Sequence, residues 1–414
     1  MGASSHNNNN FSVGLNSPVN YGDCSYIHSV LQCLLMHPIM ERAQNIRILN
    51  PNNKMLTTEI FHLYNEIKQR RTANSKNIID LFYKIADEKK DTLGNDCRFA
   101  IRDPFHFLFY LLYLLHMELN ESPGNFDLNK LLNLPIFIKK MEGTMENMFI
   151  EYLNKMHANS VIFKYFFWIE KNLYLCNKCG SYYDFIINHI FSMNIVDIYN
   201  YKNRLYPNRV QSKISLDDCF DYYCNYTYIP CEYCNSPINK TKKIFNGKTL
   251  IIRFKRNNLG NVNDVDFPNQ FNFSKYSGLA VNDNSYNLYV LKSCISFGTI
   301  GNNRKYFADI NVDVGNTGKW VRYVDSSIFE LSDNDITFFE PQLLIYELKN
   351  LESNYNNNPN MPNNNGNIPQ NNINKNFQNN NNNNNFNNVQ NVNNNFTNGF
   401  RDGNFSFYYK EPNN

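Results

Sequence analysis

Two pairs of cysteines with the spacing Cys-x-x-Cys constrain this chain more than any other feature of its sequence. The pairs are Cys176 with Cys179 and Cys231 with Cys234, and residues 180–230 separate them on strand-rich flanks. Each pair can place two thiolates about 2.3 Å from one zinc ion, so together they predict a closed, structural zinc site. Because the segment between the pairs must leave and return, we expect an extended β hairpin clamped at its base.

The alternative is that these cysteines are free thiols in a reducing compartment. Cys219 and Cys224 lie between the pairs and are interpreted as buried small apolar residues, although either could replace a ligand. A redox role is disfavoured, because neither Cys-x-x-Cys pair opens a helix after a strand.

An asparagine-rich segment differs in kind from the rest of the chain. Asparagine fills 27 of the 50 positions from 351 to 400, which leaves too few apolar side chains to offset the ordering of the backbone. We therefore predict a low-complexity tail over residues 351–414 and a short disordered leader over residues 1–10. The tail is interpreted as a genomic expansion, with self-association or partner binding as the alternative.

Composition also excludes several classes of protein. A net charge of +3 argues against a nucleic-acid binder driven by bulk charge, and no RNA-binding motif is present. The longest apolar run, residues 107–115, is far shorter than the ~20 residues that a membrane span needs, and the N-terminus has no secretory apolar region. We expect an intracellular protein, cytoplasmic or nuclear, with no membrane association and with nucleic acid disfavoured as a partner.

The order of helix and strand patterns predicts an α+β fold. Apolar residues recur at helical spacing in SYIHSVLQCLLMH, which Pro38 ends, and in DPFHFLFYLLYLLHMEL, which we expect to be a buried helix. From about residue 170 the apolar segments become short and rich in β-branched and aromatic residues, as is typical of strands. The segments in question are TLIIRFKR, NLYVLKSCISF, KYFADINVDV, KWVRYVDSSI and QLLIYELK.

Four segments in this order resemble the ubiquitin-specific proteases, a family of ubiquitin carboxyl-terminal hydrolases. The first resembles the family's Cys box, Asn-Leu-Gly-Asn-Thr-Cys-Tyr-x-Asn-Ser-x-Leu-Gln. The second is IRDPFHFLFYLLYLLHMEL, the third comprises the cysteine pairs with the strand KTLIIRFKR, and the fourth is GTIGNNRKYFADI with GKWVRYVDSS. The positions of the first box that fall in register are Asn20, Gly22, Tyr26, Ser29, Leu31 and Gln32.

The resemblance covers residues 11–350 and implies a papain-like fold of thumb, palm and fingers that cups ubiquitin. It implies a helical thumb over residues 11–165, a zinc-bearing β fingers region over residues 166–248, and a β palm over residues 249–350. It also implies a thiol protease that cleaves the isopeptide bond after ubiquitin's C-terminal Gly-Gly.

At the start of the first helix, the chain departs from the family's catalytic residues. Register with the Cys box places Ser25 at the nucleophile position and Cys24 one residue before it, where the family has Thr. A shift of one residue rotates a helical side chain by ~100°, so Cys24 does not simply substitute. Asp23 replaces the Asn that donates to the oxyanion, and a carboxylate repels that charge. His28 is interpreted as a hydrogen-bonded helix residue rather than a base.

The base and its orienting group are also replaced. Lys305 stands at the position of the family's His, and no histidine follows His189 anywhere in the chain. Val324 stands where the family has the orienting Asp or Asn, and Asp325, the next residue, matches a second acidic position.

These replacements lead to three hypotheses. The first is a pseudoenzyme, a domain without protease activity that binds ubiquitin, a ubiquitin-like protein or another protein as a scaffold. The second is an active deubiquitinase that uses Ser25 with Lys305, or Cys24, and the third is a zinc-stapled adaptor without any link to ubiquitin. In the second case Lys305 must be desolvated until its pKa falls far enough for it to act as a base.

Overall fold

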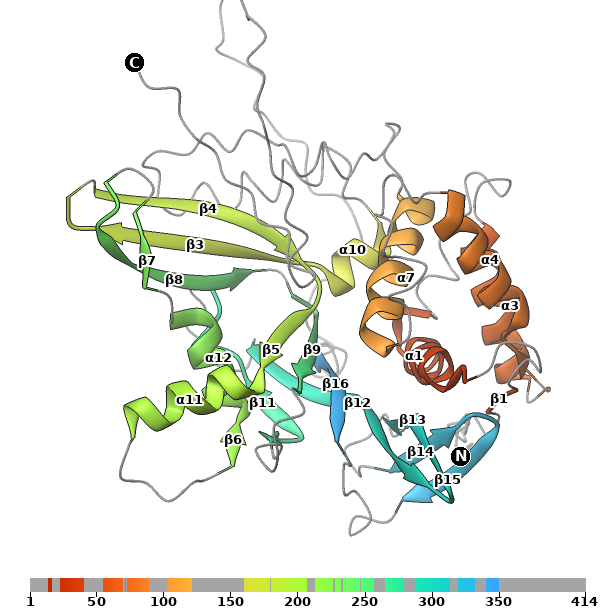
Figure 1. Cartoon of the computed structure of the whole chain (residues 1–414). Coiled ribbons are helices and arrows are strands. Elements are labelled where there is room, and N and C mark those ends of the chain that lie inside the picture. Colours follow the sequence, from red (N-terminus) through yellow and green to blue (C-terminus); the bar gives the residue numbers. More distant parts are fainter. Residues whose placement is uncertain are drawn as a thin grey trace, which may run out of the picture. The chain divides into compact units, whose positions relative to one another are not determined.

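The structure is a computed structural model, in which most helices come early in the chain and most strands come later, as Figure 1 shows. The described residues are 14–16, 23–40, 55–69, 71, 73–88, 103–120, 160–178, 180–206, 213–225, 228–231, 234–245, 247–256, 265–278, 287–312, 319–331 and 340–349. The predicted leader and asparagine-rich tail lie outside these ranges.

The elements described between residues 25 and 166 are helices, apart from the two-residue strand Ala73–Asn74, as predicted. The helices are α1 (Ser25–Leu35), α3 (Met55–Lys68), α4 (Lys76–Glu88), α7 (Pro104–Leu119) and α10 (Val161–Phe166). Every residue of α1 is buried, and the helix ends before Pro38. Helix α7 is the predicted buried helix, and it begins where the side chain of Asp103 accepts a hydrogen bond from the N–H of His106, with Pro104 in the first turn.

The C-terminal half is built on an eight-stranded sheet with the order β15-β14-β13-β12-β16-β9-β5, and β11 pairs with β12 beside this path. All pairs in it are antiparallel except β5 with β9. The strands are β5 (Phe191–Asn194), β9 (Thr249–Lys255), β11 (Gln270–Asn272), β12 (Leu288–Ile300), β13 (Asn303–Asn311), β14 (Trp320–Val324), β15 (Ser327–Leu331) and β16 (Pro341–Leu348). All five segments that the sequence pattern predicts to be strands lie in this sheet.

A second sheet of four strands has the order β4-β3-β8-β7, and Cys176, Cys231 and Cys234 lie in it or beside it. Its strands are β3 (Trp168–Cys176), β4 (Gly180–Asn188), β7 (Tyr228–Pro230) and β8 (Pro237–Phe245). Two short parallel pairs complete the strands. They join β1 (Leu15–Asn16) to β2 (Ala73–Asn74) and β10 (Val265–Asp266) to β6 (Ile214–Ser215).

The segment between the cysteine pairs is not the hairpin that the sequence analysis expects. Strand β4 is followed by β5, which joins the large sheet, and then by α11 (Ile195–Leu205) and α12 (Leu216–Asn225) before β7 returns. The start of α12 is a capping box, because Ser215 and Asp218 each accept a hydrogen bond from the other's backbone N–H. Local capping therefore produces helices within a strand-rich region.

The large sheet is buried on both faces, which explains why its central strands are almost uninterrupted apolar runs. Ile251 and Ile345 pack into a hydrophobic cluster with the helices of the N-terminal half, whereas their neighbours Ile252 and Tyr346 pack into a second cluster with α11 and α12. No helix among the described residues combines the length and apolarity needed to cross a membrane.

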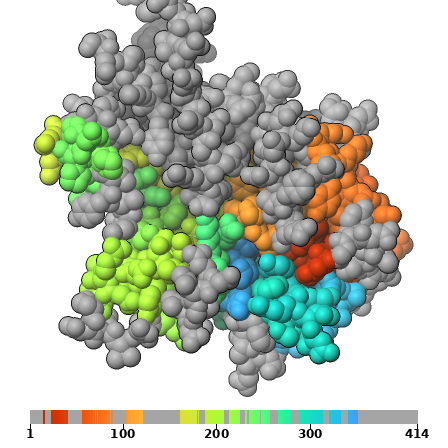
Figure 2. All heavy atoms as spheres, in the orientation of Figure 1, coloured from red at the N-terminus to blue at the C-terminus, as the bar shows by residue number. Residues whose placement is uncertain are grey.

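Helix α1 packs against β13, β14 and α7, so its N-terminus lies at the junction of the helices and the large sheet. In Figure 2 the red atoms of this region lie between the orange helices and the cyan strands. The fold therefore brings residues near position 25 beside residues near positions 305 and 325.

Candidate functional site

The N-terminus of α1 meets the hairpin of β13 and β14 through the side chain of Ser25. The Oγ atom of Ser25 accepts a hydrogen bond of 3.1 Å from the backbone N–H of Tyr306, and Ser25 is 1% exposed. The backbone N–H of Ser25 donates to Oδ1 of Asp23 at 3.0 Å, and Asp23 itself is exposed. The structure thus brings Ser25 beside the strand that carries Lys305.

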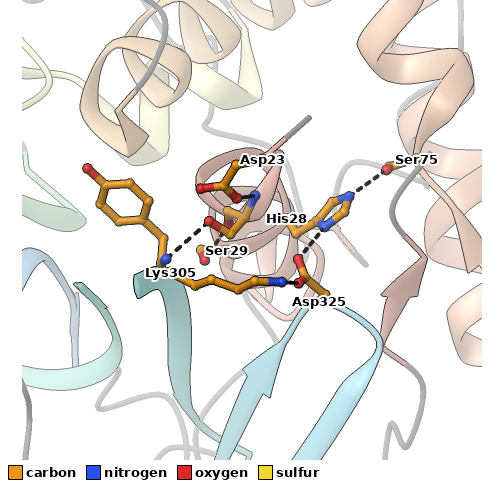
Figure 3. Close-up of polar contacts among 8 residues, drawn as sticks. Asp23, His28, Ser29, Ser75, Lys305 and Asp325 are labelled. Atoms are coloured by element: carbon orange, nitrogen blue, oxygen red, sulfur yellow. Dashed lines mark hydrogen bonds and ion pairs between the residues drawn. The ribbon is translucent and has the colours of Figure 1, made fainter. Parts of the chain in front are cut away.

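Asp325 is the centre of the polar contacts in this region (Figure 3). One carboxylate oxygen accepts a hydrogen bond of 2.8 Å from Nζ of Lys305, and the other lies 3.1 Å from Nδ1 of His28. The contact with His28, followed by that with Lys305, lowers the pKa of Asp325 to about 2 despite its burial. Asp325 is therefore an anion that joins α1 to β13.

The turn that carries Asp325 is held in place by the chain's N-terminal segment. Asp325 has a φ of 49°, an uncommon conformation for a residue other than glycine, and its carbonyl oxygen accepts a hydrogen bond of 3.1 Å from the N–H of Leu15. Gly14 passes so close that a Cβ atom there would lie 2.7 Å from the same oxygen. A side chain at position 14 would displace the turn and with it the carboxylate.

Lys305 is a cation that is not suited to accept a proton. Its hydrogen bond to Asp325 raises the pKa of the ammonium group above its usual value, and the charge of Asp23 adds to this effect. A lysine acts as a base only where desolvation or a neighbouring cation lowers its pKa. The environment of Lys305 acts in the opposite direction, which removes the main requirement of a Ser25–Lys305 dyad.

His28 is a hydrogen-bonded helix residue, as predicted. Its Nε2 atom lies 3.0 Å from Oγ of Ser75, while Nδ1 faces Asp325. This sequence of contacts has the connectivity of a Ser-His-Asp triad. Ser75 is fully buried and His28 is 3% exposed, so no substrate reaches that hydroxyl group in this conformation.

Cys24 precedes the first turn of α1 and is 4% exposed. Burial raises the pKa of its thiol, and the negative charges of Asp23 and Asp325 raise it further. A reactive cysteine needs a lowered pKa, because the thiolate is the nucleophile. The site therefore disfavours the nucleophilic form of Cys24.

Val324 ends strand β14 and is buried. An aliphatic side chain at this position offers no acceptor to orient a base. The only charged side chain in the adjoining turn, among the described residues, is Asp325, and it is paired with Lys305 and His28.

Three of the four cysteines that are predicted to bind zinc come together in the structure. The sulfur atoms of Cys176, Cys231 and Cys234 all lie within 4.8 Å of one another, and 3.6 Å separates those of Cys176 and Cys234. Thiolates ~2.3 Å from a tetrahedral metal are about 3.8 Å apart, so the spacing fits a metal ion. Cys179 lies outside the described residues.

The backbone around the second pair is shaped to present both thiols. The N–H of Asn235 donates to the carbonyl oxygen of Cys231 at 2.8 Å, and Asn235 has a φ of 54°. This hydrogen bond joins the residue after Cys234 to Cys231, which keeps the two cysteines of the pair close together. The three cysteines form a group that could hold a metal ion.

Comparison with protein families and solved structures identifies the fold. The family model described as "Ubiquitin carboxyl-terminal hydrolase" matches residues 16–346. The chain belongs to this family. No match was found among curated proteins.

Solved structures similar to this chain include deubiquitinase (DUB) modules. The yeast SAGA DUB module with a mutant Sgf73 is 18% identical, with 84% of this chain and 71% of that chain covered and a TM-score of 0.53. The SAGA Ubp8/Sgf11/Sus1/Sgf73 DUB module bound to ubiquitin aldehyde is 17% identical, with 84% and 72% covered and a TM-score of 0.53. The predicted α+β fold of the ubiquitin-specific proteases is confirmed.

Proposed function

We propose that this family member has no hydrolase activity and acts as a scaffold that binds ubiquitin or a ubiquitin-like protein. The observation that carries the proposal is the ion pair between Lys305 and Asp325. A hydrolase of this type needs a nucleophile, a base that takes its proton and a group that orients the base. At the base position this chain has a cation that its own partner keeps protonated.

The remaining positions support the same conclusion. The hydroxyl of Ser25 is a weak nucleophile without a base, and the N–H of Ser25 is bonded to the carboxylate of Asp23. A carboxylate there opposes the negative charge that develops on the carbonyl oxygen during acyl transfer. The nucleophile, the base and the oxyanion-stabilising residue are all replaced, while the fold is retained. Binding is therefore the function that the geometry supports best.

The partner is inferred from the family and from the ubiquitin aldehyde in a structure of the same fold. We propose zinc as the metal of the cysteine group, with Cys179 as the fourth ligand beside Cys176, Cys231 and Cys234. Thiolate ligands suit zinc, and a site closed by four of them has a structural role.

Ubiquitin with a C-terminal electrophile is expected to leave the full-length protein unlabelled, and a fluorogenic ubiquitin amide is expected not to turn over. Isotope-labelled ubiquitin is expected to show chemical-shift changes when the same protein is added. Labelling or turnover that disappears in Ser25→Ala or Cys24→Ala would show that the centre is active. An absence of shifts at high protein concentration would remove ubiquitin as the partner.

The purified protein is expected to contain one equivalent of zinc. Cys231→Ser is expected to lose the metal and to make the four-stranded sheet more sensitive to proteolysis, because metal binding and folding of such sites are coupled. Cys294→Ser is the matched control, since Cys294 is a buried thiol on β12 outside the cysteine group. Full zinc content in Cys231→Ser would contradict the assignment.

A further inference from the structure

The position of ubiquitin's C-terminus follows from the chemistry of the family. A hydrolase that acts at a carboxyl terminus must bring its nucleophile to the terminal carbonyl carbon. Ser25, at the assigned nucleophile position, is itself buried, so it marks the helix end towards which that carbonyl would point in the proposed complex, and the exposed Asp23 is the residue that a ligand would meet there. Asp23 is bonded to the N–H of Ser25, so its carboxylate is at the same helix end.

We propose that Asp23 makes this site select the form of ubiquitin's C-terminus, disfavouring the free carboxylate and accepting the neutral amide of a conjugate. The inference rests on the proposed binding of ubiquitin. It goes further by naming the residue that distinguishes free from conjugated ubiquitin.

The first step of the argument concerns the N-terminus of α1. Free N–H groups at the start of a helix favour an anion, both by hydrogen bonding and through the helix dipole. Here Oδ1 of Asp23 accepts the hydrogen bond from Ser25 at 3.0 Å. The protein's own carboxylate thus occupies the place where the fold would otherwise hold a ligand's carboxylate.

The second step concerns the cations around the site. Lys305 pairs with Asp325 at 2.8 Å, Arg304 with Glu340 at 3.5 Å, and Arg253 with Asp103 at 3.4 Å. Among the described residues, Asp23 is in no ion pair that would neutralise it in the same way. It is also exposed, and so it presents a negative charge to a ligand.

Neighbouring groups respond to this charge. The charge of Asp23 adds to the raised pKa of Cys24 and Tyr306, which burial raises first, and to that of Lys305, which the hydrogen bond to Asp325 raises first. In each case the contribution of Asp23 has the sign that a negative charge produces. A terminal carboxylate would enter the same potential and be repelled, whereas an amide carries no charge.

The size of the effect follows from Coulomb's law. Two unit charges ~6 Å apart in a medium with an effective dielectric constant of ~40 repel each other enough to weaken binding about tenfold. The preference should shrink as salt is added, because the screening length is ~10 Å at 0.1 M ionic strength.

Titration of the full-length protein at pH 8 and low salt tests the proposal, with two probes that differ only at the last residue. One probe is ubiquitin with its free C-terminal carboxylate, and the other is ubiquitin with a C-terminal methylamide. We expect the methylamide to bind about tenfold more tightly. Asp23→Asn keeps a hydrogen-bond acceptor beside Ser25 while removing the charge, so it should abolish most of this preference.

Asp197→Asn is the matched control, because Asp197 is an exposed carboxylate in the first turn of α11, and it should leave the preference intact. Equal affinities of the native protein for the two probes would overturn the inference while leaving ubiquitin binding established. The inference would also be overturned if Asp23→Asn retained the full preference for the methylamide. Failure of both probes to bind would instead refute the proposed function, and the inference with it.

Discussion

Replacing Arg322 with Met is expected to destabilise the folded protein by about 3–5 kcal/mol. The guanidinium of Arg322 donates to both oxygens of Asp309, at 2.7 and 2.9 Å, and Asp309 is fully buried. Methionine preserves much of the side chain's apolar volume but leaves the carboxylate without its cation. The bidentate ion pair offsets the cost of burying the carboxylate of Asp309. Without the guanidinium, that cost is no longer offset, and this accounts for most of the destabilisation.

The pH dependence of this loss has a definite sign. Burial raises the pKa of Asp309 even with Arg322 in place, and the arginine opposes that rise. Removing Arg322 must raise the pKa further, so the variant's carboxyl group takes up a proton more readily as the pH falls. The destabilisation should therefore be largest near pH 8 and should decrease towards pH 5.

Thermal unfolding of Arg322→Met at pH 8 should show a Tm lower by about 4–7 °C, from the unfolding entropy of a domain of this size. The double variant Arg322→Met with Asp309→Asn should recover part of this loss, because it removes the buried charge as well. Arg304→Met is the matched control. Arg304 is 58% exposed and pairs with Glu340 at the surface, where an ion pair contributes less than ~1 kcal/mol. Equal losses in the two single variants would contradict the argument.

The elements that sequence reasoning predicts correctly are those with a strong apolar period. Helix α1 has apolar residues on a helical period and a proline shortly after its end, and α7 has an unbroken apolar run that follows a proline in its first turn. Strands β9 and β16 consist mainly of apolar residues and lie between other strands of a sheet buried on both faces. In these segments local preference and tertiary burial favour the same structure.

Helices α11 and α12 are not predicted from the sequence, because each is short and has no long apolar run. Helix α11 is rich in β-branched and aromatic residues, whereas α12 contains three aspartates. Capping marks the start of both helices. Asn194 accepts a hydrogen bond from the N–H of Val196, and Ser215 with Asp218 forms the capping box. The spacing of Ser215 and Asp218 was visible in the sequence and could have indicated the start of α12.

At the candidate site the sequence identifies the residues but not their contacts. Alignment to the family's boxes singles out Lys305 and Asp325, yet it does not show that they form an ion pair. That pair depends on a turn with a left-handed residue and on Leu15 holding the turn from a distant part of the chain. Ser75 carries no motif at all, and only the fold places it beside His28.

Acidification from pH 6.5 to pH 5 is expected to reduce the free energy of unfolding by about 3 kcal/mol, chiefly through two histidines. His116 and His189 are buried, and the ring of Phe167 contacts both of them. Burial lowers the pKa of each to about 3, and the proximity of His189 adds to the effect on His116.

The direction follows from the protons bound in each state. Both imidazoles have an ordinary pKa near 6.5, so below that pH the unfolded chain binds two protons that the folded chain excludes until about pH 3. Stability is therefore complete above pH 6.5 and falls as the pH decreases, by at most ~2.7 kcal/mol per pH unit for two groups. Asp325 contributes only at lower pH, because its stabilisation is lost as the pH falls from 3.8 towards 2.

Urea unfolding at pH 8, 6.5 and 5 measures the slope of the free energy of unfolding against pH. His189→Phe should roughly halve it, because phenylalanine preserves ring stacking against Phe109 and Phe167 and cannot take up a proton. His62→Gln is the control, since His62 is 69% exposed and its replacement should leave the slope unchanged. If the slope in His189→Phe equals that of the native protein, other groups cause the acid sensitivity. The variant's unfolded chain binds one proton fewer at position 189, and this change would then have had no effect on stability.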